Sequence, residues 1–183
     1  GFGIKKVMEQ QAVTSGIIGS VADIIKVEEK YETAIETALG GSIQNIVTDT
    51  QKTAKKMIEY LKKNRYGRVT FLPLDAVKGK EFARKEILLE PGVIGAANQL
   101  VIYDEVYKDL FASLLGQILV VKDMDAGIKI ANKYHHSVRI VTLDGDSLNR
   151  GGAMSGGAFK NKSNLLGRSR EVEELKKKLD RWT

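Results

Sequence analysis

The sequence predicts a mixed α/β (α+β) fold made of two similar halves packed as one body. The first observation is an internal repeat, because the stretches that begin at Tyr31 and Tyr107 show the same succession of helix, strand, helix and strand patterns. The second is the alternation of short β-branched runs with amphipathic segments, which indicates strands and helices in one body. The third is a heptad-like apolar spacing at the chain ends, which indicates flanking coiled-coil stumps.

The first half is expected to span residues 15–75. Its opening helix covers residues 31–40 and ends in a Leu-Gly pair, where glycine suits the left-handed position that ends a helix. The strand "SIQNIVTD" follows and ends at Asp49, which is placed to cap a second helix over residues 50–63. A strand led by arginine, residues 68–71, completes the half. The apolar face of the second helix is predicted to comprise Ala54, Met57, Ile58 and Leu61.

The second half, residues 101–160, repeats this order. A helix over residues 107–116 ends in another Leu-Gly pair, and the strand "QILVVKD" ends at Asp123, again placed as a helix cap. The next helix is predicted over residues 124–134, followed by a strand over residues 139–142. The apolar side of that helix is predicted to include Ile128 and Ala131.

Residues 76–100 connect the halves. They contain Pro91 and a basic run, which predicts an irregular connector followed by a short helix or strand at "GVIGAANQL". After the second half's last strand, "TLDGDSLN" predicts a hairpin that turns at Asp144-Gly145, a dipeptide favoured in type I′ turns. The glycine-rich run that follows is then a returning strand.

The two ends, residues 1–14 and 161–183, are predicted to be stumps of longer coiled-coil helices. Segments this short are not stable as isolated helices, so they are expected to lie side by side where the chain leaves the body. The N-terminal pattern is the weaker and consists of Ile4, Val7 and Gln11. The C-terminal apolar side chains recur at steps of three and four and are Val172, Leu175, Leu179 and Trp182.

The composition excludes several classes of protein. The 183 residues include no cysteine, so disulfides and thiolate sites are excluded and a reducing, cytoplasmic location is expected. The apolar runs are far shorter than the roughly 20 residues that a membrane span needs, and no membrane partner is expected. The net charge is +6, and residues 150–183, with nine basic and four acidic side chains, supply most of it. A polyanion partner or a solvated coiled-coil face would each account for that asymmetry.

The sequence offers no catalytic, metal or cofactor site. The glycine pairs before Lys160 lack the spacing of a phosphate-binding loop, and Ser155 is one residue away from a nucleophile-elbow pattern. The two histidines, His135 and His136, are adjacent at a predicted helix end, where they point in different directions and cannot ligate one metal as a pair. An enzyme or nucleotide-binding domain that uses the glycines as an anion loop remains the alternative from another class.

The run "GGAMSGG" is the candidate interaction element. Glycine in a strand costs about 0.5–1 kcal/mol relative to alanine, so two pairs of glycines indicate the close approach of another backbone or a ligand. An intermolecular sheet and a loop or bulge within one chain are both consistent with this pattern. The candidate dimer-interface residues are Gly151, Gly152, Met154, Ser155, Gly156 and Gly157.

Two groups of basic residues are candidates for DNA contact. Few aromatic residues lie near them, which favours contact with phosphates over base stacking. The affinity of such contacts for DNA should fall steeply as salt rises. The alternative for each lysine taken alone is a solvated surface. The first group follows the glycines and consists of Lys160, Lys162, Arg168 and Arg170. The second lies at the end of the first half's second helix and consists of Lys62, Lys63 and Arg65.

These motifs resemble the hinge domain of SMC (structural maintenance of chromosomes) proteins, and most closely a bacterial one. The resemblance rests on "YETAIETALGGSIQNIVTD", "YGRVTFLPL", "RIVTLDGD", "GGAMSGG" and "LLGRSRE", which together extend over most of the chain. The GG-x-x-SGG element at residues 151–157 is the most specific of them.

The resemblance implies a domain that interrupts the antiparallel coiled-coil arms of a long ATPase and dimerises with a second copy. Each of two interfaces would join the first half of one chain to the second half of the other, with the four glycines and Ser155 at the contact and Lys160 and Lys162 near DNA. The ATPase motifs of the family belong to other domains, so this chain is expected to have no enzymatic site and to act in chromosome condensation and segregation at the nucleoid. A purely structural dimerisation module without DNA binding remains open.

Overall fold

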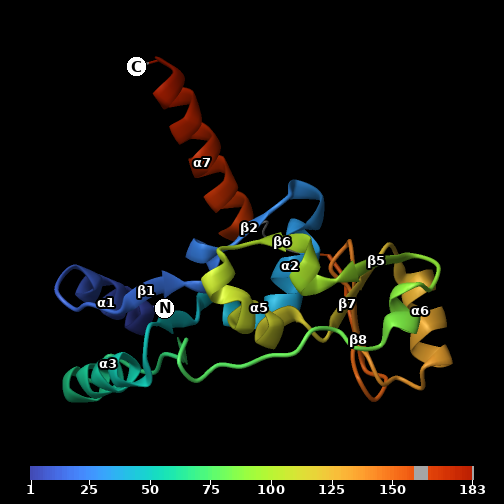
Figure 1. The fold of residues 1–183 in the computed structure, drawn as a ribbon, viewed down its shortest axis with the longest axis horizontal. Coiled ribbons are helices and arrows are strands. Elements are labelled where there is room, and N and C mark those ends of the chain that lie inside the picture. The colour runs from blue at the N-terminus through green and yellow to red at the C-terminus, as the bar shows by residue number, and fades with distance from the viewer. Residues whose placement is uncertain (159–164, 183) are drawn as a thin grey trace.

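A computed structural model describes residues 1–158 and 165–182 of the 183-residue chain. The mixed α/β fold is confirmed. Figure 1 shows the first half on one side of the molecule and the second half on the other, with α2 and α5 between them. The strands form three sheets, in the orders β1-β3-β4, β10-β9-β8-β7-β5 and β2-β6.

The first half contains the three-stranded sheet. Its strand β3 pairs antiparallel with β1 and parallel with β4. The strands of this sheet are β1 (Ile17–Ser20), β3 (Ile46–Thr48) and β4 (Phe71–Pro73), and the helices of this half are α2 (Glu32–Leu39) and α3 (Gln51–Asn64). Before them comes α1 (Phe2–Glu9).

The second half repeats this arrangement and extends it. Strand β7 pairs antiparallel with β5 and parallel with β8, and the antiparallel strands β9 and β10 continue the sheet beyond β8. Its elements are β5 (Val93–Ala96), β7 (Ile118–Val121), β8 (Arg139–Thr142), β9 (Ser147–Leu148), β10 (Met154–Ser155), α5 (Lys108–Leu115) and α6 (Met124–Lys133). In the described part of the first half, nothing corresponds to β9 and β10, so β4 ends its sheet.

Short elements connect these units. Strands β2 (Lys26–Val27) and β6 (Val101–Ile102) pair across the two halves, and the C-terminal helix is α7 (Leu165–Trp182). The connector is irregular apart from α4 (Lys85–Leu88), and "GVIGAANQL" forms β5 and a 3-10 turn. The 3-10 helices are η1 (Gln10–Ala12), η2 (Val21–Ile24), η3 (Glu29–Tyr31), η4 (Gly40–Gln44), η5 (Ala97–Leu100) and η6 (Glu105–Tyr107).

The two halves share one hydrophobic core. Ile35 of α2 and Phe111 of α5 are fully buried in the same cluster, together with Val47 of the first sheet and Val120 of the second. Leu166, in the first turn of α7, is 4% exposed and belongs to this cluster as well. Each half also has a smaller buried cluster of its own, which includes Ile46 and Met57 in the first half and Leu119, Ile130 and Ile140 in the second, so the shared cluster joins the two.

Two details of the predicted helices were wrong. Thr50, rather than Asp49, caps α3, because its hydroxyl accepts the Thr53 N–H while the Asp49 carboxylate accepts the Thr50 N–H. Asp123 does cap α6, by accepting the Ala126 N–H at 2.9 Å. Ile58 and Ile128 are 40% and 37% exposed, because each lies about 100° around its helix from a buried neighbour, Met57 and Gly127 respectively.

The predicted strand 68–71 and the predicted hairpin turn also differ from the structure. Strand β4 begins only at Phe71, where pairing with Ile46 of β3 starts. Between β8 and β9 the Gly145 N–H donates to Thr142 O, and the Thr142 N–H donates to Asp146 O, which defines a three-residue loop. Only Gly145 in that loop has a positive φ, of 90°, whereas a type I′ turn needs two such residues.

The termini differ from each other. Val7 of α1 is fully buried and Ile4 is partly buried, both in a cluster with Met57 and Leu61 of α3. Figure 1 shows α7 projecting away from the body. The side-by-side pairing of two terminal stumps therefore stays a prediction. In the described part of the chain, no helix combines the length and apolarity needed to cross a membrane.

Candidate dimer interface and arm junction

Strand β10 forms one edge of the five-stranded sheet. Met154 and Ser155 pair with Leu148 and Ser147 of β9, and the order of the sheet leaves the opposite side of β10 without a neighbouring strand. Both residues are exposed, Met154 by 54%. The predicted returning strand is therefore confirmed for Met154 and Ser155, which form an exposed edge, whereas the four glycines lie outside the strand.

The backbone of Met154 faces the open side of β10. The Asn149 N–H donates to Ala153 O at 2.8 Å, so this opposed pair is a hydrogen-bonded one. Hydrogen-bonded and non-hydrogen-bonded pairs alternate along an antiparallel ladder, so the next pair, Met154 with Leu148, is non-hydrogen-bonded. The N–H and C=O of Met154 consequently point away from β9, where a further strand would receive them.

Backbone conformation and contacts within the chain explain why glycine occupies positions 151, 152, 156 and 157. Gly151 and Gly152 form the turn into β10 with φ values of 84° and 103°, and the Gly151 N–H donates to His136 O. Gly157 has a φ of 132°. A Cβ on Gly156 would lie 2.4 Å from Asp146 Oδ1 of the same chain. These intrachain requirements account for glycine at the four positions, and their role in contacting a second chain stays a prediction.

The candidate DNA-contact residues do not form one cluster within the chain. Lys62 and Lys63 are exposed in the last turn of α3, and Arg65 ends that helix in the left-handed conformation with a φ of 55°. Arg168 is exposed in the first turns of α7. Figure 1 places α3 and α7 on different sides of the body. Lys160 and Lys162 lie outside the described residues.

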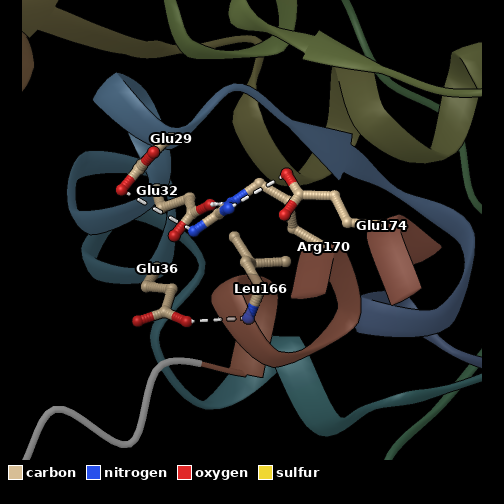
Figure 2. Close-up of polar contacts among 6 residues, drawn as sticks. All are labelled: Glu29, Glu32, Glu36, Leu166, Arg170 and Glu174. Carbon is tan, nitrogen blue, oxygen red and sulfur yellow. Dashed lines mark hydrogen bonds and ion pairs between the residues drawn. The ribbon is translucent and has the colours of Figure 1, made fainter. Parts of the chain in front are cut away.

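Arg170 belongs to an ion cluster inside the molecule, as Figure 2 shows. Its guanidinium contacts Glu32 Oε1 of α2 at 2.5 Å, Glu174 of α7 at 3.2 Å and Glu29 of η3 at 3.7 Å. Glu32 is 3% exposed, and its hydrogen bond is the main reason that the pKa of Arg170 lies above its usual range. The guanidinium is thus held by three carboxylates, and a contact of Arg170 with phosphate stays a prediction.

Glu36 completes this junction. Its carboxylate accepts the Leu166 N–H at 3.0 Å, so an acid on α2 satisfies a backbone donor in the first turn of α7 (Figure 2). Burial raises the pKa of Glu36, and this effect outweighs the opposing effect of the Leu166 N–H. Sequence reasoning missed Glu32 and Glu36. The available signal was that Glu32 precedes Ile35 and Leu39 by three and seven residues, on the apolar face of a helix.

The acidic and histidine side chains of the described residues do not gather into a metal site. Among them, no group of three or more His, Asp or Glu side chains is placed to hold a metal ion. His135 and His136 follow the end of α6 in a turn with φ values of 57° and 55°, which confirms that they are a helix-end feature.

Comparison with known proteins decides the family. The model of the flexible hinge domain of SMC proteins matches residues 14–131. The chain belongs to the SMC hinge family. Relatives named chromosome partition protein Smc share 45% identity over 184 residues in Desulfitobacterium hafniense and 43% over 181 residues in Bacillus subtilis, each across 97% of this chain. The hinge chain spans only 15% of the length of these two relatives.

Solved SMC hinges have the same fold. An asymmetric dimer of the Geobacillus stearothermophilus SMC hinge domain matches with a TM-score of 0.90 and 43% identity, over 99% of this chain and 74% of that one. The Pyrococcus furiosus hinge domain matches with a TM-score of 0.70 and 31% identity, over 88% of each chain. The predicted two-half hinge fold is thus confirmed.

Proposed function

We propose that this hinge domain joins two copies of its chain through the open side of β10. The single observation that carries the proposal is the exposed edge strand whose Met154 N–H and C=O point away from β9. The similar hinge domain of Geobacillus stearothermophilus is described as a dimer, which supports the proposal.

The partner strand in the proposal is β4 of the second copy. The two halves repeat the same pairing, yet β8 is followed in its sheet by β9 and β10, whereas β4 is the last strand of its sheet. Docking β10 of one chain beside β4 of the other would supply neighbours to both open edges. A two-fold dimer would contain this contact twice, and it would join the first half of each chain to the second half of the other.

Replacing Met154 with proline tests the strand pairing directly. Proline has no N–H and its ring obstructs a neighbouring strand, so M154P should raise the dimer's dissociation constant at least about tenfold. The matched control, M154A, removes the side chain and keeps the N–H, so it should remain mainly dimeric where M154P is monomeric. Analytical ultracentrifugation at a series of concentrations gives both constants, and circular dichroism confirms that each variant is folded. If M154P associates as tightly as M154A, β10 is not the interface.

We further propose that the hinge serves a chromosome-partitioning ATPase in the cytoplasm, at the nucleoid. The names of the relatives support this role, and their greater length leaves room for coiled-coil arms and ATP-binding domains beyond these residues. The hinge itself is proposed to act without an ATPase site or a cofactor. The rival reading, a nucleotide-binding domain, requires nucleotide to raise the melting temperature of this chain.

Sequence-independent DNA binding is a second proposed function, supported by the net charge of +6 and by the exposed Lys62, Lys63, Arg65 and Arg168. Lys160 and Lys162 stay in the proposed set on the resemblance. If Lys62 and Lys63 contact phosphates, K62E/K63E should weaken DNA binding and lower the slope of log K against log salt by up to about 2.

The control for this experiment is K78E/K108E, which makes the same charge change at two exposed lysines elsewhere on the body. Fluorescence anisotropy with an arbitrary duplex at several salt concentrations reports both variants. An equal effect of the two variants would mean that net charge alone drives binding. If the wild-type chain shows no salt-dependent affinity for DNA, the hinge is a purely structural dimerisation module.

A further inference from the structure

The base of α7 is tied to the body by polar contacts on successive turns. The Leu166 N–H donates to Glu36 of α2, Arg170 pairs with Glu32 of α2, and Glu173 pairs with Lys26 of β2 at 3.2 Å. These contacts come from two elements of the first half, α2 and β2.

The Arg170–Glu32 contact is the strongest of these ties on grounds of burial. The Glu32 side chain is 4% exposed and the Arg170 side chain 26%, whereas the side chains of the Lys26–Glu173 pair are 63% and 47% exposed. Exposed pairs contribute little because water and salt screen them, but a carboxylate out of water needs a cation or hydrogen-bond donors close to it. Any movement that carries Arg170 away from α2 therefore removes a cation from a buried acid.

The acidic side of the junction cannot follow such a movement. Glu32 lies on α2 beside Ala34 and Ile35, which are fully buried in the core shared by the two halves. Its position is therefore set by the packing of the whole body.

Beyond this point α7 still contacts the body through the Lys26–Glu173 pair, whose side chains are both exposed. Every residue from Glu171 to Trp182 is exposed, including the apolar Leu175, Leu179 and Trp182 at 60%, 68% and 89%. Arg170 is thus the last residue of α7 that is partly buried, and Figure 2 shows it against Glu29 and Glu32 of the body.

We propose that the Arg170–Glu32 pair, with Glu29 and Glu174 around it, fixes the direction in which the C-terminal arm leaves the hinge. Glu36 acts as the accompanying positioning residue through the Leu166 N–H. Intact, the junction transmits the orientation of the body to the arm as one rigid unit. Without the ion pair, α7 remains a helix but pivots about its first turn. The inference concerns a single chain and does not depend on dimerisation.

Distances between two spin labels test this proposal. The chain has no cysteine, so S113C on α5 and K177C on α7 provide a unique labelled pair at two exposed positions. Labelled chains are mixed with excess unlabelled chains so that each dimer carries one labelled copy. The wild-type background should give a single narrow distance distribution. In R170Q and in E32Q the distribution should become at least about twice as wide, because the restraint on the exposed helix is lost.

Two further variants keep the test decisive. K55Q breaks the exposed Lys55–Glu59 pair on α3, far from the junction, and should leave the distribution unchanged. E32Q/R170M removes both charges and retains the long side chains. It should therefore fold even if R170Q does not, because in R170Q the buried Glu32 carboxylate loses its cation. Circular dichroism establishes folding in each case. A distribution as narrow in folded E32Q/R170M as in the wild type would overturn the proposal, and broadening confined to the junction variants supports it.

Discussion

At the scale of single residues, the ion pair between Arg170 and Glu32 shows that burial decides what a charged side chain does, because Glu32 is 3% exposed. Position 170 was assigned to DNA from its charge, but the charge of a side chain does not reveal its neighbours, and Glu32 lies 138 residues away in the sequence. The sequence singled out the glycines at 151–157 for the close approach of another backbone, and their contact with a second chain stays a prediction. Their intrachain reasons, such as the approach of Asp146 to Gly156, depend on a tertiary contact that the sequence pattern does not contain.

Glu36 gives a pH-dependent prediction at this scale. Burial raises its folded-state pKa above the ordinary 4.5, so as pH falls the folded protein binds this proton before the unfolded chain does. The stabilising contribution of the bound proton is fully present below 4.5 and is lost as pH rises through the raised pKa. The free energy of unfolding of the wild type should therefore increase relative to E36Q as pH falls through that window.

Urea unfolding of both proteins at a series of pH values gives this difference directly. A difference that stays constant, or that moves in favour of E36Q as pH falls, would show that Glu36 does not have a raised pKa.

At the scale of elements, the repeat and most helices were predictable because apolar periodicity and capping residues are local signals. The sequence did not predict that β4 begins at Phe71 or that the loop at Asp144 has three residues. Pairing with neighbouring strands decides where a strand ends, and a sequence pattern does not show that pairing. The glycines around β10 left an exposed edge strand and a loop or bulge both open in the sequence, and the free edge of β4 emerges only when the two sheets are compared.

The close approach of Gly156 to Asp146, which follows the β8–β9 loop, gives a second prediction of stability. A Cβ at Gly156 would displace the Asp146 carboxylate, which accepts the Thr142 hydroxyl at 3.1 Å. G156A should lower the free energy of unfolding by about 1–2 kcal/mol. The matched control is G41A, because nothing lies within 4 Å of a Cβ there, and it should change stability by less than about 0.5 kcal/mol. Equal effects of the two substitutions in urea unfolding would contradict the assigned contact.

At the scale of the whole molecule, the hinge is one body in which β4 and β10 each lie at the edge of a sheet and α7 projects outward (Figure 1). The internal repeat predicted two related halves, but the shared core around Ile35 and Phe111 is a property of their packing. The surplus of strands in one half and the deficit in the other make the halves complementary rather than equivalent. That difference is the physical reason to expect two chains to complete each other.

Cross-linking between chains tests this account most directly. One set of chains carries T70C, beside β4, and the other carries S155C on β10, and both positions are exposed. Paired strands lie about 5 Å apart, so a short thiol cross-linker should join the two kinds of chain when they are mixed. Either kind alone should give little product, because its two cysteines lie at separate interfaces. The account predicts a covalent dimer from the mixture, and it is contradicted if the mixture yields no more product than either variant alone.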